Sequence, residues 1–178
     1  YPESWRDLGA LVEGKTGLFQ YAVYLGNGLS EAEDLAAGQQ FRDNNRSKAV
    51  GGRLSLNLSR GFEAGGSYHR SRFDEAGERA LTLWGAHVAW VTEGFRFLYE
   101  YGRAGIENPA GFDDGQARGQ LVLGSLNLGG FLPVVSYQKL DYDDLYHGAG
   151  FSSRPGAAGA GIAAAGSRWT AGLVITPI

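Results

Sequence analysis

The chain has 178 residues, a formal net charge of −3 and no cysteine, and glycine and aromatic residues are abundant. These values fit a folded domain, and they exclude a disordered polymer and the clustered basic surface that nucleic acids require. Abundant glycine and aromatic residues favour β-strands joined by tight turns. Together with the absence of cysteine, this composition favours an exported protein over a cytosolic enzyme. No stretch approaches the about eighteen uninterrupted apolar residues of a transmembrane helix, so none is expected.

Two strands with one apolar face are predicted at the start of the chain. The first spans Asp7–Gly14 and the second Leu18–Asn27, with a turn at Gly14–Gly17 between them. Their apolar positions are Leu8, Ala10, Val12, Phe19, Tyr21, Val23 and Leu25. The polar segment Gly28–Lys48 then predicts a long loop.

The clearest two-residue period lies in Ala49–Phe73. Its apolar positions are Val50, Leu54, Leu56, Leu58, Phe62, Ala64 and Tyr68, and the alternate positions include Gly51, Arg53, Ser55, Asn57, Ser59, Glu63, Ser67 and His69. Because Arg60-Gly61 separates two such runs, an antiparallel hairpin is predicted. Each run continues for about ten residues, the length of a tilted strand that crosses a hydrocarbon layer. The pattern is typical of an outer-membrane barrel, with apolar residues toward lipid and polar residues toward the lumen.

Five further strands are predicted after this hairpin. They lie at Arg79–Val91, from Phe95 to Gly102, at Gln116–Leu128, at Phe131–Tyr142 and at Arg168–Ile175. Between Leu132 and Tyr142 neither face is purely apolar. Two explanations of this pattern are a bulge in the strand and an outer surface that is covered by protein. The glycine- and alanine-rich run Gly148–Gly166 predicts another long loop.

The connections between the predicted strands alternate between short and long, and the short turns all fall on one side. This asymmetry is expected of outer-membrane barrels, which have short periplasmic turns and longer extracellular loops. The chain supplies about nine strands, whereas bacterial single-chain barrels use even numbers. We therefore expect an all-β fold, an antiparallel transmembrane β-barrel of porin type. Residues 1–178 would form one region of it, incomplete at both ends, with any signal peptide outside the sequence.

Five segments together carry a resemblance to a known family. They are Trp5-Arg6-Asp7-Leu8-Gly9, Tyr24-Leu25-Gly26-Asn27-Gly28, Phe41-Arg42-Asp43-Asn44-Asn45, Thr92-Glu93-Gly94-Phe95 and Pro133-Val134-Val135-Ser136-Tyr137-Gln138-Lys139. In these segments the chain resembles the phosphate-selective porin O/P family and its related porins. The resemblance implies a trimeric outer-membrane channel of about sixteen strands that passes small anions, with this chain in its later part. It does not identify the solute.

Charged residues at the polar positions are candidates for a pore wall. Arg53, Arg96 and Arg168 would face the lumen, where guanidinium groups relay anions without holding them tightly. Glu63 and Glu100 would be acidic counter-charges on the same wall. The alternative is that these charges pair across neighbouring strands as a structural network.

Six aromatic residues fit the girdles that lie at headgroup level in membrane barrels. They are Tyr68, Trp84, Trp90, Tyr99, Tyr101 and Trp169. The alternative is ordinary core packing in a soluble β-protein.

No catalytic site, metal site or cofactor is predicted. His69, His87 and His147 lie far apart without metal-ligand spacing, and there is no cysteine to complete a zinc site. We therefore do not expect an enzyme.

The sequence thus predicts an outer-membrane porin of a Gram-negative bacterium. It would form a water-filled channel for passive diffusion of small hydrophilic solutes, with a preference for anions such as phosphate. The expected partners are outer-membrane lipid, lipopolysaccharide, small anions and further copies in a homotrimer, but no nucleic acid. One alternative is a structural or accessory barrel without open-channel activity, its interior plugged by side chains. The other is a soluble lipocalin-like carrier, in which the apolar residues would face inward.

Overall fold

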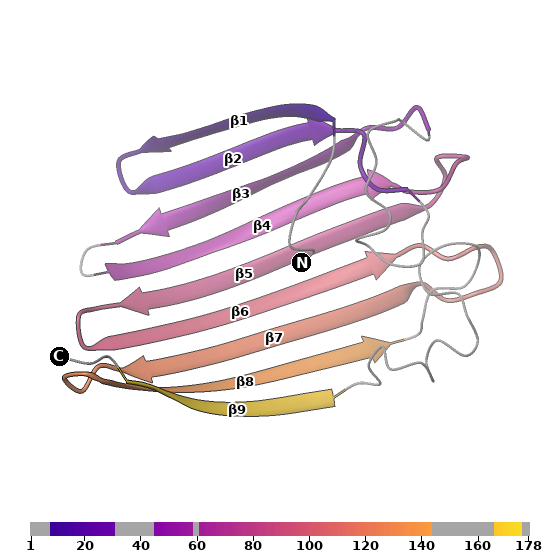
Figure 1. Ribbon diagram of the computed structural model, residues 1–178. Coiled ribbons are helices and arrows are strands. Elements are labelled where there is room, and N and C mark those ends of the chain that lie inside the picture. Colours follow the sequence, from indigo (N-terminus) through magenta and orange to yellow (C-terminus); the bar gives the residue numbers. More distant parts are fainter. Residues whose placement is uncertain (1–7, 31–44, 59–60, 144–165, 176–178) are drawn as a thin grey trace.

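The computed structural model describes residues 8–30, 45–58, 61–143 and 166–175, which form nine strands and no helix. The strands are β1 (Gly9–Thr16), β2 (Phe19–Gly26), β3 (Ala49–Asn57), β4 (Phe62–Arg72), β5 (Ala80–Val91), β6 (Phe95–Ile106), β7 (Gly115–Leu126), β8 (Phe131–Asp143) and β9 (Gly166–Ile175). Each strand pairs antiparallel with the next, so the sheet order follows the chain from β1 to β9 (Figure 1). The prediction of an all-β fold with about nine antiparallel strands is confirmed.

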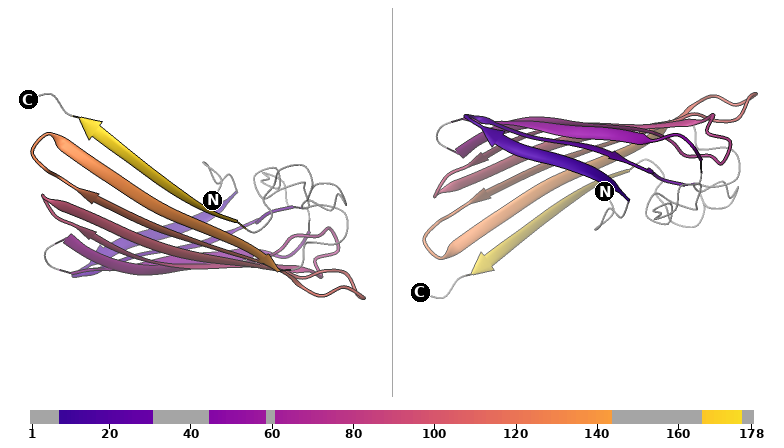
Figure 2. Two further views of the ribbon diagram at one scale, coloured as in Figure 1. Left: turned by 90° about the horizontal axis from the view of Figure 1, so that it is seen from below. Right: turned by 90° about the horizontal axis from the view of Figure 1, so that it is seen from above.

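The sheet is bent rather than flat. Figure 2 shows that the edge strands β1 and β9 lie on the same side of the central strands, so the sheet encloses a trough. Among the described residues, β1 pairs only with β2 and β9 only with β8. Each edge strand therefore has one side without a strand neighbour in this part of the chain.

The connections at the two ends of the sheet differ in length, as the sequence predicted. The hairpin turns at one end are 17–18, 58–61, 92–94 and 127–130, and the connections at the other end are 27–48, 73–79, 107–114 and 144–165. We call these the turn end and the loop end.

The first hairpin differs from the prediction. We expected a strand at Asp7–Gly14 and a turn at Gly14–Gly17, but β1 continues to Thr16, which pairs with Phe19. The turn is made by Gly17 and Leu18, and Gly17 has a φ of 56°, a conformation that glycine adopts without steric cost. The predicted turn was therefore placed too early in the chain. Asp7 lies outside the described residues.

The pairing of β7 with β8 contains no bulge in the described register. Residues 116–125 pair one by one with residues 143–134, so the ambiguous alternation reflects apolar residues on both faces. Most of the predicted loop Gly148–Gly166 lies outside the described residues, and Gly166 already belongs to β9.

A small apolar core lies at the loop end of the sheet. Leu29 and Phe73, from the connections after β2 and β4, are fully buried with Leu81 of β5, and Leu83 of the same strand is buried beside them. Ala104 and Ile106 of β6 pack against this cluster. The core therefore holds two loop-end connections against one face of the sheet.

Candidate functional site

The strand register sorts side chains onto two faces that differ in exposure. Ala22, Ser55 and His69 lie on one face and are between 5% and 8% exposed. Val23 and Leu54 lie on the other face and are 55% and 54% exposed. We call the first the sheltered face and the second the exposed face. Because side chains crowd on the concave side of a bent sheet, we take the sheltered face to be the inside of the trough.

The exposed face is largely apolar. Its highly exposed apolar residues include Val12, Tyr21, Val23, Leu25, Val50, Leu54, Trp84, Trp90, Phe131, Val135, Trp169, Leu173 and Ile175. A soluble protein rarely leaves a continuous apolar surface of this extent in contact with water. The polarity of this sheet is therefore inverted relative to that of a soluble β-protein.

All six predicted girdle residues lie on the exposed face, where aromatic rings gather in two zones. Toward the loop end, Tyr68 is opposite Trp84, and the Trp84 ring is 5.1 Å from the Tyr101 ring. We call Tyr68, Trp84 and Tyr101 the loop-end aromatic row. On β8 and β9 the rings of Tyr137 and Trp169 are 4.7 Å apart, in the register row of Tyr99.

The second zone lies nearer the turn end, where the ring of Trp90 meets that of Phe95 at 5.8 Å. Trp84 and Trp90 are six positions apart on β5, which corresponds to about 20 Å along the strand. Tyr99 lies opposite Val88, between the two zones.

All five predicted wall residues lie on the sheltered face by register, namely Arg53, Arg96, Arg168, Glu63 and Glu100. Within the described part of the chain, no salt bridge joins the three arginines to the two glutamates. Instead, Glu63 Oε1 lies 3.0 Å from His87 Nε2 across β4 and β5. Arg168 donates a hydrogen bond of 2.7 Å to Gln138. Among the residues that the structure describes, the direct arginine–glutamate network considered from the sequence is therefore not present.

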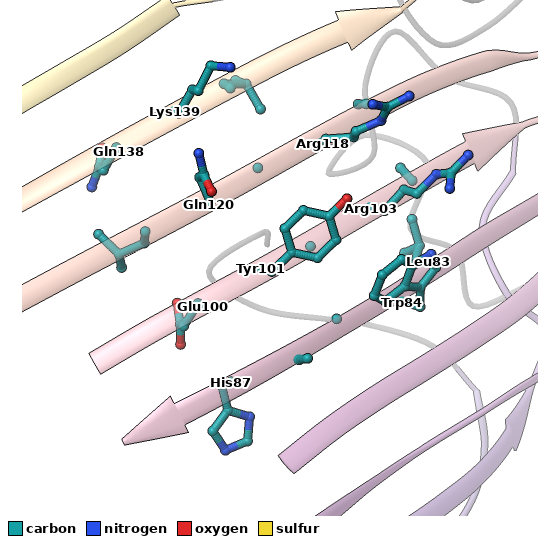
Figure 3. A pocket seen from close by; sticks show the side chains of 18 of the residues that line it. Leu83, Trp84, His87, Glu100, Tyr101, Arg103, Arg118, Gln120, Gln138 and Lys139 are labelled. Carbon is teal, nitrogen blue, oxygen red and sulfur yellow. The ribbon is translucent and has the colours of Figure 1, made fainter. Parts of the chain in front are cut away.

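A hollow of about 820 Å³ runs along β4 to β9, and its lining comes from both faces of the sheet. His87, Glu100, Gln138 and Arg168 belong to the sheltered face, and Trp84, Tyr101, Arg103, Arg118 and Lys139 to the exposed face. Figure 3 shows several of the lining residues, which come from neighbouring strands. Its floor includes a row of glycines, since Gly102 pairs with Gly85 on one side and with Gly119 on the other. A Cβ atom added at Gly102 would meet nothing within 4 Å. The absence of side chains along this row keeps the trough open.

On β2 and β3, the ring of Tyr24 covers Gly51 on the sheltered face. A Cβ atom added at Gly51 would lie 2.5 Å from the ring of Tyr24, which is opposite it on β2. The Tyr24 hydroxyl forms a hydrogen bond with His69 Nδ1, and His69 Nε2 lies 3.1 Å from Ser71 Oγ. Sequence reasoning missed this network, because only the strand register brings Tyr24, Gly51 and His69 into one row.

The sheltered face is not polar throughout. Toward the turn end of β6, β7 and β8 it carries Leu98, Leu121, Leu123, Leu132 and Val134. These residues account for the ambiguous sequence pattern of β7 and β8.

Among the described residues, no group of three or more histidine and acidic side chains could hold a metal ion. His69 and His87 take part in the separate contacts given above, and His147 lies outside the described residues. In the same part of the chain, no helix is long and apolar enough to cross a membrane.

Comparison with protein-family models, curated proteins and solved structures found no match. The resemblance to the phosphate-selective porins therefore stays a prediction.

Proposed function

We propose that this chain is part of a transmembrane β-barrel in the outer membrane of a Gram-negative bacterium. Its sheltered face would line a water-filled channel for passive diffusion of small hydrophilic solutes, with a preference for anions. The exposed face would contact lipid.

The inverted polarity of the sheet is the observation that carries this proposal. Burying apolar surface contributes roughly 25 cal/mol per Å², so a face like that of Val23, Leu54 and Trp169 is stable only against an apolar environment. In a soluble lipocalin-like carrier the apolar residues would occupy the inside of the bend, whereas here the sheltered side of β3 and β4 carries Arg53, Ser55 and His69, and leucines line it on β6 and β7. A lipid layer fits this distribution.

Strand length agrees with the same environment. The strands β5 to β7 have 12 residues each. Such a strand is about 40 Å long and, tilted by about 40°, spans about 30 Å, the thickness of a hydrocarbon core. The two aromatic zones, about 20 Å apart along β5, would at this tilt lie about 15 Å apart across the layer, which places them within the span of the strands rather than at its two ends.

The unpaired sides of β1 and β9 indicate a larger barrel. Backbone groups at an open sheet edge find no partner in hydrocarbon, so a membrane sheet must close. We infer that further strands or a closing contact pair these two edges in the complete protein. This inference agrees with the predicted barrel of about sixteen strands.

The charges of the sheltered face support a modest anion preference. The strand residues on this face include four cationic side chains, Lys15, Arg53, Arg96 and Arg168, and three acidic ones, Glu13, Glu63 and Glu100. Glu63 is already engaged by His87. A wall with a small cationic excess favours anions without binding them tightly.

The decisive experiment measures the zero-current potential of the full-length protein in a planar lipid bilayer under a potassium chloride gradient. We expect stepwise conductance and a potential of anion-selective sign. The double charge reversal Arg53→Glu/Arg96→Glu should move the potential toward cation selectivity. Reversal of Lys15 alone, at the turn end of the same face, serves as a smaller control perturbation. An unchanged potential in the double variant would remove the arginines from the transport path.

A second function is favoured by one specific observation. The apolar residues Leu98, Leu121 and Leu123 on the sheltered face would suit a barrel whose interior is filled, serving as a structural or accessory protein. The same bilayer experiment separates the two functions, because a filled barrel inserts into the membrane without conductance.

A further inference from the structure

A histidine lies between two acidic side chains on the sheltered face. His87 of β5 is directly opposite Glu100 of β6, and its Nε2 atom is 3.0 Å from Oε1 of Glu63 on β4. Figure 3 shows His87 and Glu100 on their neighbouring strands. We call Glu63, His87 and Glu100 the histidine group. Sequence analysis placed the two glutamates on the wall and assigned no role to His87.

The His87 ring is held in place and is still in contact with solvent. A Cβ atom added at Gly65, its partner on β4, would lie 2.5 Å from His87 Cε1, so the ring covers this glycine. The contact with Glu63 fixes the opposite side of the strand pair. The side chains of His87 and Glu63 are 31% and 37% exposed. Protons in the proposed lumen therefore reach the imidazole directly.

The charged groups that face His87 come from β3, β4 and β6. Glu63 and Glu100 are the nearest. Arg53 lies two strands away on β3, one row nearer the loop end. Arg96 lies on β6, four residues before Glu100 and roughly 13 Å from it along the strand. Within β5 and β7, the sheltered face carries no ionisable side chain other than His87.

The charge of the histidine group depends on His87. Histidine is the side chain that ordinarily changes its charge between pH 5 and 8. When His87 is neutral, the group carries the negative charges of both Glu63 and Glu100. When His87 is protonated, its contact with Glu63 becomes an ion pair, and Glu100 faces a positive charge on the adjacent strand. Protonation therefore halves the net negative charge at this point of the wall.

The other histidine of the described strands is placed differently. His69 is only 5% exposed, and its two ring nitrogens contact the Tyr24 hydroxyl and Ser71 Oγ. A charge on a buried ring is unfavourable unless it is compensated. A change of charge that ions in the lumen would encounter is therefore assigned to His87 and not to His69.

We propose that His87 is the residue through which pH sets the ion selectivity of the channel. This inference rests on the proposed function, in which the sheltered face lines a water-filled lumen. Protonation adds a positive charge beside Glu100, so the preference for anions increases on acidification. A unit charge about 10 Å from the path of an ion changes the local ion concentration about twofold in water, in opposite directions for anions and cations. The permeability ratio of chloride to potassium should therefore rise about two- to fourfold.

The test measures the zero-current potential of the full-length protein in planar bilayers under a potassium chloride gradient, at about pH 8 and about pH 5.5. Low ionic strength limits screening. His87→Gln keeps a hydrogen-bond donor for Glu63 but no titratable ring, so most of the pH-dependent shift should be lost. His87→Lys carries a positive charge at both pH values and should show the acidic wild-type selectivity at both. Heat-modifiable migration in gels verifies that each variant is folded.

The matched control is Glu63→Gln, which removes a carboxylate from the same group and leaves the imidazole. It should increase the preference for anions at about pH 8 and still respond to acidification. A shift that is equal in His87→Gln and the wild type would overturn the proposal, because the carboxylates would then be its source. Loss of the shift in Glu63→Gln with its retention in His87→Gln would overturn it in the same way.

Conductance of the wild type separates this inference from the proposed function. A conducting protein whose selectivity does not respond to pH overturns the role of His87 and leaves the channel. A wild type that does not conduct at either pH value removes the channel and this role together.

Discussion

Replacing Gly51 with alanine should destabilise the protein, because Tyr24 occupies the space that the new methyl group needs. The added Cβ atom would lie 2.5 Å from Tyr24 Cε1 and 2.6 Å from its hydroxyl oxygen. Relieving such a contact requires the ring to move, and overpacking of this kind costs roughly 1–3 kcal/mol. Displacing the ring also breaks the hydrogen bond between Tyr24 and His69, worth about 1 kcal/mol.

One effect opposes this loss. A change from glycine to alanine restricts the unfolded chain and stabilises the folded state by roughly 0.4–1 kcal/mol where the backbone and the space allow it. The net expectation for Gly51→Ala is a loss of about 1–3 kcal/mol in the free energy of unfolding. Gly102→Ala is the matched control, because Gly102 lies on the same sheltered face and a Cβ there meets nothing within 4 Å. Its expected change is a gain of less than about 1 kcal/mol.

Urea unfolding in phospholipid vesicles, followed by the fluorescence of the four tryptophans, measures both variants. A double-mutant cycle tests whether the Tyr24 ring causes the loss. In a Tyr24→Ala background the Gly51→Ala change should lower the free energy of unfolding much less, because the ring is absent. Equal midpoints for Gly51→Ala and Gly102→Ala would refute the packing argument, as would strict additivity in the cycle.

Two further perturbations test other parts of the sheet. Gly102→Phe should lower single-channel conductance because its ring projects into the trough, whereas Ala86→Phe on the exposed face should leave conductance unchanged. Equal conductance of the two variants in planar bilayers would contradict the assigned faces. Asp74→Ala should cost about 2–4 kcal/mol in urea unfolding, because a buried carboxylate accepts backbone hydrogen bonds from Glu78 and Arg79, and exposed Glu75→Ala should cost little. If the two losses are equal, the buried carboxylate does not hold this loop.

The sequence alone predicted the strands well where one face is apolar. In β3 and β4 the alternation of Val50, Leu54 and Leu56 with Arg53 and Ser55 assigned every side chain to the face that the register gives. The first hairpin was placed too early because two glycines, Gly14 and Gly17, are equally suitable for a turn. The choice depends on pairing, since the Tyr21 ring of β2 covers Gly14 and keeps it within the strand.

The candidate site was predicted only in part. The face on which a side chain lies follows from the local alternation of the sequence, whereas its contacts depend on the register between neighbouring strands. Arg53, Arg96 and Arg168 lie on the expected face of the sheet. The pairing of Glu63 with His87, 24 residues apart, requires the alignment of β4 with β5, which the connection between them does not reveal.

The two kinds of surface on the sheltered face bear on where solutes would move in the proposed channel. Leu98, Leu121 and Leu123 form an apolar region toward the turn end, and water gains little by contact with it. Arg53, Glu63 and His87 lie on β3 to β5, where the His87 ring covers Gly65 and Glu63 contacts His87. Ions that pass beside Arg53, Glu63 and His87 keep contacts with polar groups. Ions that pass beside the leucines have no such contacts. In the proposed channel, the path of ions therefore follows β3 to β5, and Arg53 should influence selectivity more than Arg168, which is bound to Gln138 at the edge of the sheet.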